Sequence, residues 1–256
     1  MESISKTQYN FIKQLTKHNF DGIEIVQGVP KVVYICWFGH KKDFTPSFTI
    51  RRYKALLSLV ESLKVPVIML TWDNYKSFEV KSSPMHPGFE YLSGNHKSDY
   101  LRAYMLYHYG GGYHDIKYRE LSWDKEWDKF VNPNVWIIGR RELKPDSIGF
   151  PPGEEWIQQE YEKLITMGWV ISRPKTKYLD DLLSEINFRL DINLDNLLTN
   201  PAFQCRQSEQ TNIDSQNYLY PFRWLELMGE IFHKLLLSYT DYIDYTLPDI
   251  IYKTYK

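Results

Sequence analysis

The strongest constraint on the fold is a pair of apolar runs that are separated by one helix-length segment. Residues 31–39 read KVVYICWFG and residues 65–73 read VPVIMLTWD, and each run suits a strand that is buried on both faces. Between them, residues 46–63 carry leucines and a valine at helical spacing. Two such strands joined through a helix become parallel strands of one sheet, with a right-handed crossover. The segment therefore predicts an α/β fold around a single, mainly parallel central sheet flanked by helices.

The length and composition fit one domain of this kind. The chain has 256 residues, of which 43% are hydrophobic, so it can bury a full core. We expect a single domain over residues 1–256, with an amphipathic helix over about 1–20 and a largely helical part over about 190–256. Apolar patterns predict further strands at 136–139, 167–171 and 218–222, and helices at 154–165, 174–190 and 223–237, with one or two short helices within 192–217.

Charge and cysteine content exclude several functional classes. The formal net charge is -1, which argues against a nucleic-acid binder because such proteins carry a basic stripe. The two cysteines, Cys36 and Cys205, supply neither a disulfide framework nor a zinc cluster. The chain shows no apolar leader and no run of membrane-spanning length. We therefore expect a cytoplasmic protein without a transmembrane segment, in a bacterial cytosol or in the host cytoplasm if a virus encodes it; the sequence does not indicate an oligomeric state.

The helix that contains residues 98–102 (SDYLR) carries an acid and a base on one face. Asp99 and Arg102 are three residues apart, so they can pair with each other or hold one ligand together. Either Asn95 or Ser98 is expected to cap the start of this helix. An ordinary salt bridge on the helix surface is the simpler alternative.

A glycine triplet and an acid follow this helix directly. Gly110 suits a left-handed residue at the helix end, and Gly111 and Gly112 let another backbone or a ligand come close. A short strand over residues 113–116 would then place Asp115 near its carboxyl end, where open α/β sheets bind ligands. The whole arrangement suits a site that holds a diphosphate and a sugar, whereas a surface turn with scattered charges is the alternative.

Three blocks of the chain resemble the DxD-type sugar-binding glycosyltransferases. This family includes capsular-polysaccharide and fungal mannosyl transferases and, more distantly, the glucosylating toxins of clostridia. Residues 29–39 resemble the family's opening strand, I-P-K-I-I-H-Q-I-W-x-G. Residues 98–117 resemble S-D-x-x-R followed by G-G-x-Y-x-D-x-D, which is the most specific of the three matches. Residues 168–174 resemble a later strand that precedes a helix.

The resemblance implies a nucleotide-binding fold of the glycosyltransferase A type. It further implies transfer of a sugar from a nucleotide-diphosphate sugar to a glycan or glycoconjugate acceptor, with retention at the anomeric carbon. A UDP-linked donor is favoured by analogy with cytosolic members of the family, and a GDP-linked donor is possible. Mn²⁺ or Mg²⁺ would normally accompany the donor.

The resemblance also implies roles for individual residues. Trp37 would lie beside the nucleotide base, although a core tryptophan at a strand end is the alternative. Asp99 and Arg102 would bind the sugar hydroxyls and the diphosphate, which suits a carboxylate and a guanidinium fork. Asp115 would contact the ribose and the metal. The remaining residues that the resemblance assigns to donor binding are Tyr34, Gly111, Gly112 and Tyr113, and it assigns catalytic roles to Arg102, Asp115 and Lys117.

One departure from the family pattern concerns the metal. The last acid of the DxD motif, which normally holds the cation, is Lys117 in this chain. A protonated lysine cannot be a ligand. Three alternatives follow: the ammonium replaces the metal, or Asp115 holds a metal with the diphosphate and water, or the protein binds sugar nucleotides without turning them over. Because side chains alternate along a strand, Asp115 and Lys117 should face the same side, which favours the first alternative.

The acceptor side is less defined by the sequence. Polar residues that could contact an acceptor are Asp146, Glu154, Glu155, Gln204, Glu209 and Gln210, and each also fits a solvated surface. Besides a degenerate sugar-nucleotide or glycan-binding protein, the remaining rival function is an interaction protein that uses an aromatic surface. An interaction protein would leave the arrangement of Asp99, Arg102 and Asp115 unexplained.

Overall fold

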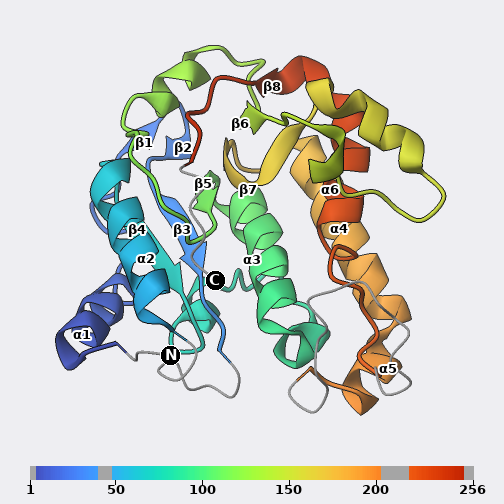
Figure 1. The fold of residues 1–256 in the computed structure, drawn as a ribbon, viewed down its shortest axis with the longest axis horizontal. Helices are drawn as coiled ribbons and strands as arrows, with labels where there is room; N and C mark the ends of the chain where they lie inside the picture. The colour runs from blue at the N-terminus through green and yellow to red at the C-terminus, as the bar shows by residue number, and fades with distance from the viewer. Residues whose placement is uncertain (1–3, 40–47, 203–218, 251–256) are drawn as a thin grey trace.

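The computed structural model describes residues 4–39, 48–202 and 219–250, and these form an α/β fold around a six-stranded sheet (Figure 1). Its strand order is β4-β3-β5-β7-β6-β8. All strands except β7 run in one direction, because β7 is antiparallel to both of its neighbours while the other pairs are parallel. The expected α/β class with a mainly parallel sheet is confirmed. The strands are β3 Val33–Cys36, β4 Val67–Leu70, β5 Gly111–His114, β6 Ile137–Arg141, β7 Ile165–Ser172 and β8 Ile243–Asp244, and a separate small sheet pairs β1 Ile25–Val26 with β2 Val29–Pro30.

The predicted strand-helix-strand unit is present. Helix α2 (Ile50–Leu63) connects β3 to β4, and these strands pair in parallel. The Thr49 side chain caps the helix by accepting from the Arg52 backbone, and the left-handed residue Lys64 ends it. Strand β4 is shorter than the apolar run that predicts it. The Asn74 side chain accepts from Thr71 N and donates to Met69 O, so the chain turns away there.

The two faces of the sheet have separate cores. Side chains alternate along β3, so that Tyr34 and Cys36 lie in one core and Val33 and Ile35 in the other. The first core packs against helices α3, α4 and α6, and the second packs against α1 and α2 (Figure 1). The helices other than α2 are α1 Lys6–Leu15, α3 Gly94–His108, α4 Lys177–Ile192, α5 Leu194–Thr199 and α6 Gly229–Leu236, and the short 3₁₀ helices are Tyr75–Phe78, Pro87–Tyr91, Glu126–Val131, Pro145–Ser147, Glu155–Lys163 and Leu237–Tyr242.

The C-terminal part differs from the sequence-based expectations. The predicted strand at 218–222 is absent from the described residues 219–222, because the Tyr220 hydroxyl accepts from Ser93 N and binds His96, which ties this segment to the start of α3. The helix expected from 223 begins only at Gly229, since the Glu226 carboxylate accepts from the Arg223 backbone in a turn.

Three further boundaries were predicted wrongly or lie outside the described residues. Residues 155–163 form a 3₁₀ helix, where an α-helix was expected. Ser93 caps α3 by accepting from His96 N, in place of Asn95 or Ser98. Within 192–217, α5 is one of the expected short helices, and residues 203–217 lie outside the described part of the chain.

Candidate active site

The candidate site lies where strand β5 ends and strand β7 begins. Because β7 is antiparallel to β5, its first residues meet the carboxyl end of β5 at one edge of the sheet (Figure 1). Strand β5 covers residues 111–114, where 113–116 was expected, so that Asp115 directly follows it; the Asp115 backbone N–H donates to the Gly168 carbonyl at 2.7 Å. This hydrogen bond fixes Asp115 at the sheet edge where α/β folds bind ligands.

The glycines before β5 bring helix α3 and the sheet close together. Gly110 has φ +71° and its N–H donates to Leu106 O, which closes the helix. A Cβ on Gly111 would lie 3.0 Å from Val32 O, and one on Gly112 would lie 3.0 Å from Val33 Cγ2. Close packing against β3 therefore accounts for both glycines, and their predicted contacts with a donor stay predictions.

A buried arginine joins the two carboxylates of the motif. Arg102 Nη2 lies 3.3 Å from Asp99 Oδ1 and 3.3 Å from Asp115 Oδ1, and Nη1 donates to Met167 O at 2.8 Å. The side chains of Arg102 and Asp99 are only 6% and 8% exposed. The Tyr113 hydroxyl donates to Asp115 Oδ1 at 3.1 Å. Helix α3, strand β5 and strand β7 thus fix one charged cluster, which we call the Asp-Arg-Asp cluster (Asp99, Arg102, Asp115).

Lys117 lies on the open side of this cluster. Its Nζ is 3.5 Å from Asp115 Oδ2 and 5.0 Å from the centre of the Trp169 ring. Asp115 and Lys117 are 32% and 25% exposed, so both are accessible from solvent. The two side chains do lie together as expected, but strand alternation is not the cause, because β5 ends at His114 and the chain bends at Ile116. Gly168 leaves room beside them, because a Cβ there would lie 3.1 Å from Asp115 Oδ2.

The surroundings act differently on the two carboxyl groups. Burial raises the pKa of Asp99 to about 7, although Arg102 opposes the change. Burial would also raise the pKa of Asp115, but Lys117 and Arg102 together outweigh it and lower that pKa below its ordinary value. Asp115 is therefore ionised at neutral pH, whereas Asp99 changes protonation there.

The Asp99 titration predicts a pH effect on stability. Since the folded-state pKa lies above the ordinary value of 3.8, folding is favoured when Asp99 is protonated. The stabilisation of the folded state by protonated Asp99 is fully present below about pH 4. It is lost as the pH rises to about 7. We expect the thermal midpoint of the wild type, relative to Asp99→Asn, to fall by several degrees between these pH values and to stay level above them. A difference that is independent of pH would contradict the raised pKa.

The residues present do not fit a resident metal ion. Among the described ranges, no three His, Cys, Asp or Glu side chains are grouped closely enough to hold one. The oxygens of Asp115, the expected ligand, already face two cations, Lys117 on Oδ2 and Arg102 on Oδ1. An ammonium stands where the second acid of the motif would bind a metal.

Tyr34 and Trp37, two of the residues predicted to contact the donor, have aromatic packing partners in the structure. Tyr34 is fully buried, and its ring packs edge-on against Phe20. The half-buried Trp37 packs edge-on against Phe48, with the Arg52 guanidinium 4.2 Å from its ring centre. Both rings are packed, yet Tyr34 OH and Trp37 Nε1 have no hydrogen-bond partner among the described residues, and contacts of either residue with a nucleotide remain predictions.

Glu142, which the sequence analysis does not name, directly follows β6 as Asp115 follows β5. Its backbone N–H donates to Leu164 O at 2.9 Å. Burial raises the pKa of Glu142 to about 7, against the opposing effects of Ser147 and the charge of Lys117. Its position directly after a strand was the signal in the sequence.

The six residues that the sequence offered as acceptor contacts have different positions. Asp146 and Glu155 are exposed, and Glu154 pairs with Lys234 at 2.6 Å. The other three, Gln204, Glu209 and Gln210, lie outside the described residues.

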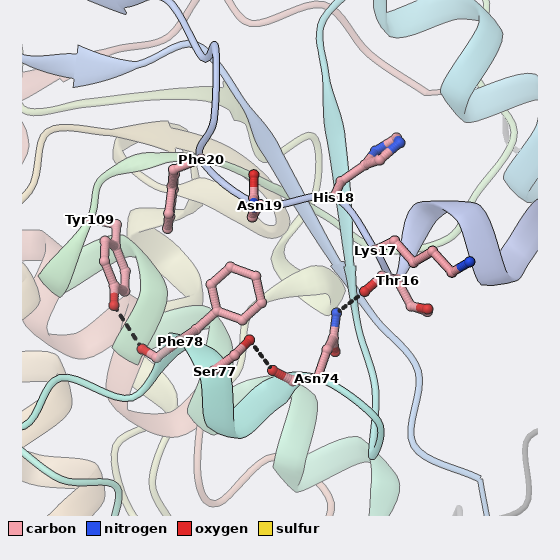
Figure 2. Close-up of a pocket in the computed structure, with 9 residues that line it drawn as sticks. All are labelled: Thr16, Lys17, His18, Asn19, Phe20, Asn74, Ser77, Phe78 and Tyr109. Carbon is pink, nitrogen blue, oxygen red and sulfur yellow. Dashed lines mark hydrogen bonds between the residues drawn. The ribbon is translucent and has the colours of Figure 1, made fainter.

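A pocket of about 370 Å³ lies elsewhere, beside strand β4 (Figure 2). The Phe20 and Tyr109 rings stack along one side of it, with centroids 4.8 Å apart. The Tyr109 hydroxyl donates to Phe78 O, and Ser77 Oγ donates to Asn74 O, as the dashed lines show. None of the cluster residues lines this pocket, whose lining is Thr16, Lys17, His18, Asn19, Phe20, Asn74, Ser77, Phe78 and Tyr109.

Part of the chain that carries this cluster matches the model of one known family. Residues 29–119 match the family model described as "Glycosyltransferase sugar-binding region containing DXD motif", and the matched range contains Asp99, Arg102, Asp115 and Lys117. The resemblance expected from the sequence is confirmed over these residues.

Comparison with solved structures gives the "PaToxG Glycosyltransferase" as a similar chain. The two are 14% identical with a TM-score of 0.45, and the match covers 91% of this chain and 77% of the other. No curated protein matches the chain. Within the described residues, none of the helices has the length and apolar character needed to cross a bilayer.

Proposed function

We propose that this protein is a glycosyltransferase that moves a sugar from a nucleotide-diphosphate sugar to a hydroxyl group of a glycan or glycoconjugate, with retention at the anomeric carbon. A UDP-linked donor is our first choice. The observation that carries the proposal is the Asp-Arg-Asp cluster with Lys117 beside it, at the carboxyl end of β5.

The chemistry of each group suits one part of the donor. Asp115, ionised and partly exposed, accepts hydrogen bonds from vicinal hydroxyls of the ribose, and Asp99 does the same for the sugar when it is ionised. Arg102 Nε is buried and has no hydrogen-bond partner among the described residues. An oxygen of the donor would supply the missing hydrogen-bond acceptor.

Lys117 supplies positive charge for the departing diphosphate. When the bond between the anomeric carbon and the diphosphate oxygen breaks, its electron pair goes to the diphosphate. An ammonium that is already in place stabilises this charge more than reorienting water would. Its ion pair with Asp115 and its position over Trp169 hold Lys117 at the site. We therefore propose that transfer does not require a divalent metal.

Thermal unfolding with a panel of UDP- and GDP-sugars, each with Mn²⁺ and with EDTA, tests the proposal. A donor at a hundred times its dissociation constant should stabilise the fold by about 2.7 kcal/mol. We expect one donor class to raise the unfolding temperature, and the rise to persist in EDTA. If no nucleotide sugar stabilises the protein under either condition, the proposed function is wrong.

Nucleotide release separates an enzyme from the alternative, a degenerate protein that only binds sugar nucleotides. Transferases of this kind hydrolyse their donor slowly when water replaces the acceptor. The stabilising donor should therefore release free nucleotide during incubation with the protein. Stabilisation without any release would favour the binding protein.

A further inference from the structure

His114 is a residue of the donor motif to which the proposed function gives no part. It is the last residue of β5, directly before Asp115, and it is fully buried. Its ring contacts Trp123 and Trp169, with ring centres 5.3 and 5.9 Å away, in the core on the opposite face of the sheet from Tyr113. A polar ring in this apolar core needs a hydrogen-bond partner for each of its nitrogens.

Two hydrogen bonds fix the protonation state of the His114 ring. Nδ1 binds the carbonyl oxygen of Asp115, which can only accept, so Nδ1 must carry a proton. Nε2 lies 3.3 Å from Nη1 of Arg119, which can only donate, so Nε2 must be the acceptor. Both partners therefore require the same neutral form of the imidazole, with its one ring proton on Nδ1.

Arg119 is itself held in place by several hydrogen bonds. It is fully buried, and its Nε donates to Leu121 O at 2.8 Å while Nη2 donates to Pro248 O at 3.1 Å. The Arg119 carbonyl accepts from Ser58 Oγ on α2 at 2.7 Å. Because both the backbone and the guanidinium group are fixed, Arg119 also fixes the orientation of the His114 ring.

His114 contacts both supports of Lys117. The Asp115 carbonyl that His114 binds lies just before the bend at Ile116, and this bend returns Lys117 Nζ to within 3.5 Å of Asp115 Oδ2. The His114 ring also stacks on Trp169 at an interplanar angle of 25°, and Lys117 Nζ lies 5.0 Å from the centre of that same ring. The position of Lys117 therefore depends on His114 through the backbone and through Trp169.

We propose, on the basis of the proposed function, that His114 is a positioning residue that sets the place of Lys117 beside Asp115, with Arg119 fixing the orientation of its ring. The ammonium stabilises the departing diphosphate because it is in place before the bond breaks. A displacement of about 1 Å in such a group can lower the rate by about 10²-fold. His114 thus controls turnover from the core, without contacting the donor.

Two substitutions of His114 test this role through donor hydrolysis, with the donor that the thermal panel identifies. His114→Leu nearly keeps the volume of the ring but loses both hydrogen bonds, so nucleotide release at saturating donor should fall by about 10²-fold. In His114→Asn an amide N–H can take the place of Nδ1–H, and this variant should release nucleotide about tenfold faster than His114→Leu, which is the worth of one hydrogen bond.

A double-mutant cycle with Lys117→Ala shows whether His114 acts through Lys117. The loss that His114→Leu causes should be about tenfold smaller in the Lys117→Ala background, because residues that act together are not additive. His233→Leu is the matched control, since His233 is also fully buried and its ring accepts from the Gly149 backbone at 2.9 Å. It should lower the unfolding temperature as His114→Leu does, and leave nucleotide release close to that of the wild type.

Three results would overturn the proposal: wild-type release by His114→Leu, equal release by the leucine and asparagine variants, or losses from His114→Leu and Lys117→Ala that simply multiply. The ring proton provides a test without any donor. In wild-type protein with isotope-labelled histidine rings, the NMR signal that His114→Leu removes should belong to a neutral ring protonated at Nδ1.

The NMR result separates this inference from the proposed function. A ring protonated at Nε2 would refute the inference and leave the proposed function standing. If the ring is protonated at Nδ1 but the wild type binds no donor, the proposed function fails, and the positioning role falls with it.

Discussion

Asparagine in place of Asp115 is expected to lower donor turnover by at least about 100-fold. Truncating one member of a hydrogen-bonded charge pair costs about 2–5 kcal/mol, and about 1.4 kcal/mol corresponds to a factor of ten. Asp115 faces two cations, Arg102 and Lys117, but it is 32% exposed, so the lower half of that range applies to binding alone. Loss of the ribose contact that we propose for Asp115 would add to this effect.

Nucleotide release and thermal unfolding with the stabilising donor check this prediction. Asp128→Asn is a suitable control, because Asp128 is exposed in the 3₁₀ helix Glu126–Val131. The Asp115→Asn variant should unfold as one cooperative unit and should no longer be stabilised by the donor. Full turnover by Asp115→Asn would show that the donor site has been placed wrongly.

Alanine in place of Lys117 is expected to reduce turnover by about 10²–10³-fold, which is typical when one preorganised group that stabilises developing charge is removed.

Aspartate in place of Lys117 should change the metal dependence of turnover. Lys117→Asp recreates the acid-x-acid spacing beside Asp115 and removes the competing ammonium. We expect this variant to be inactive in EDTA and to recover part of its activity with Mn²⁺, whose preferred ligands are carboxylate oxygens.

The wild type provides the decisive comparison, because its turnover should be the same in EDTA and in Mn²⁺. Lys125→Ala, an exposed lysine beyond the motif, serves as the control for loss of positive charge. If EDTA abolishes wild-type turnover while Lys117→Ala remains active, a metal held by Asp115 and the diphosphate is the correct alternative.

The parts of the fold that the sequence predicts well depend on local patterns. The strand-helix-strand unit has strong apolar periodicity, and the spacing of Asp99, Arg102 and Asp115 comes from one helix and one adjoining strand. The reversed strand β7 was not predicted, because its place depends on the pairing of β6 with β7 and of β7 with β5. No local pattern encodes those pairings.

Side-chain orientation at the sheet was also beyond the sequence. The position of Tyr34 in a strand was predictable, but its edge-on contact with Phe20 was not. The late start of α6 has a similar origin, because Gly229 packs directly on Gly149, and a Cβ on Gly149 would lie 2.6 Å from the Gly229 carbonyl carbon. Contacts between distant segments overrode helix propensity there.

The reversed direction of β7 has a consequence for how such a protein can diversify. The connection over residues 142–164 leaves the sheet after β6 and returns to it at β7, and both of its ends are held by strand pairing. Insertions or exchanges within it need not disturb β5 or α3, which carry the donor motif. Sequence changes in this connection can therefore accumulate in evolution, or be introduced by grafting, while the helix and strand that position Asp99, Arg102 and Asp115 stay unchanged.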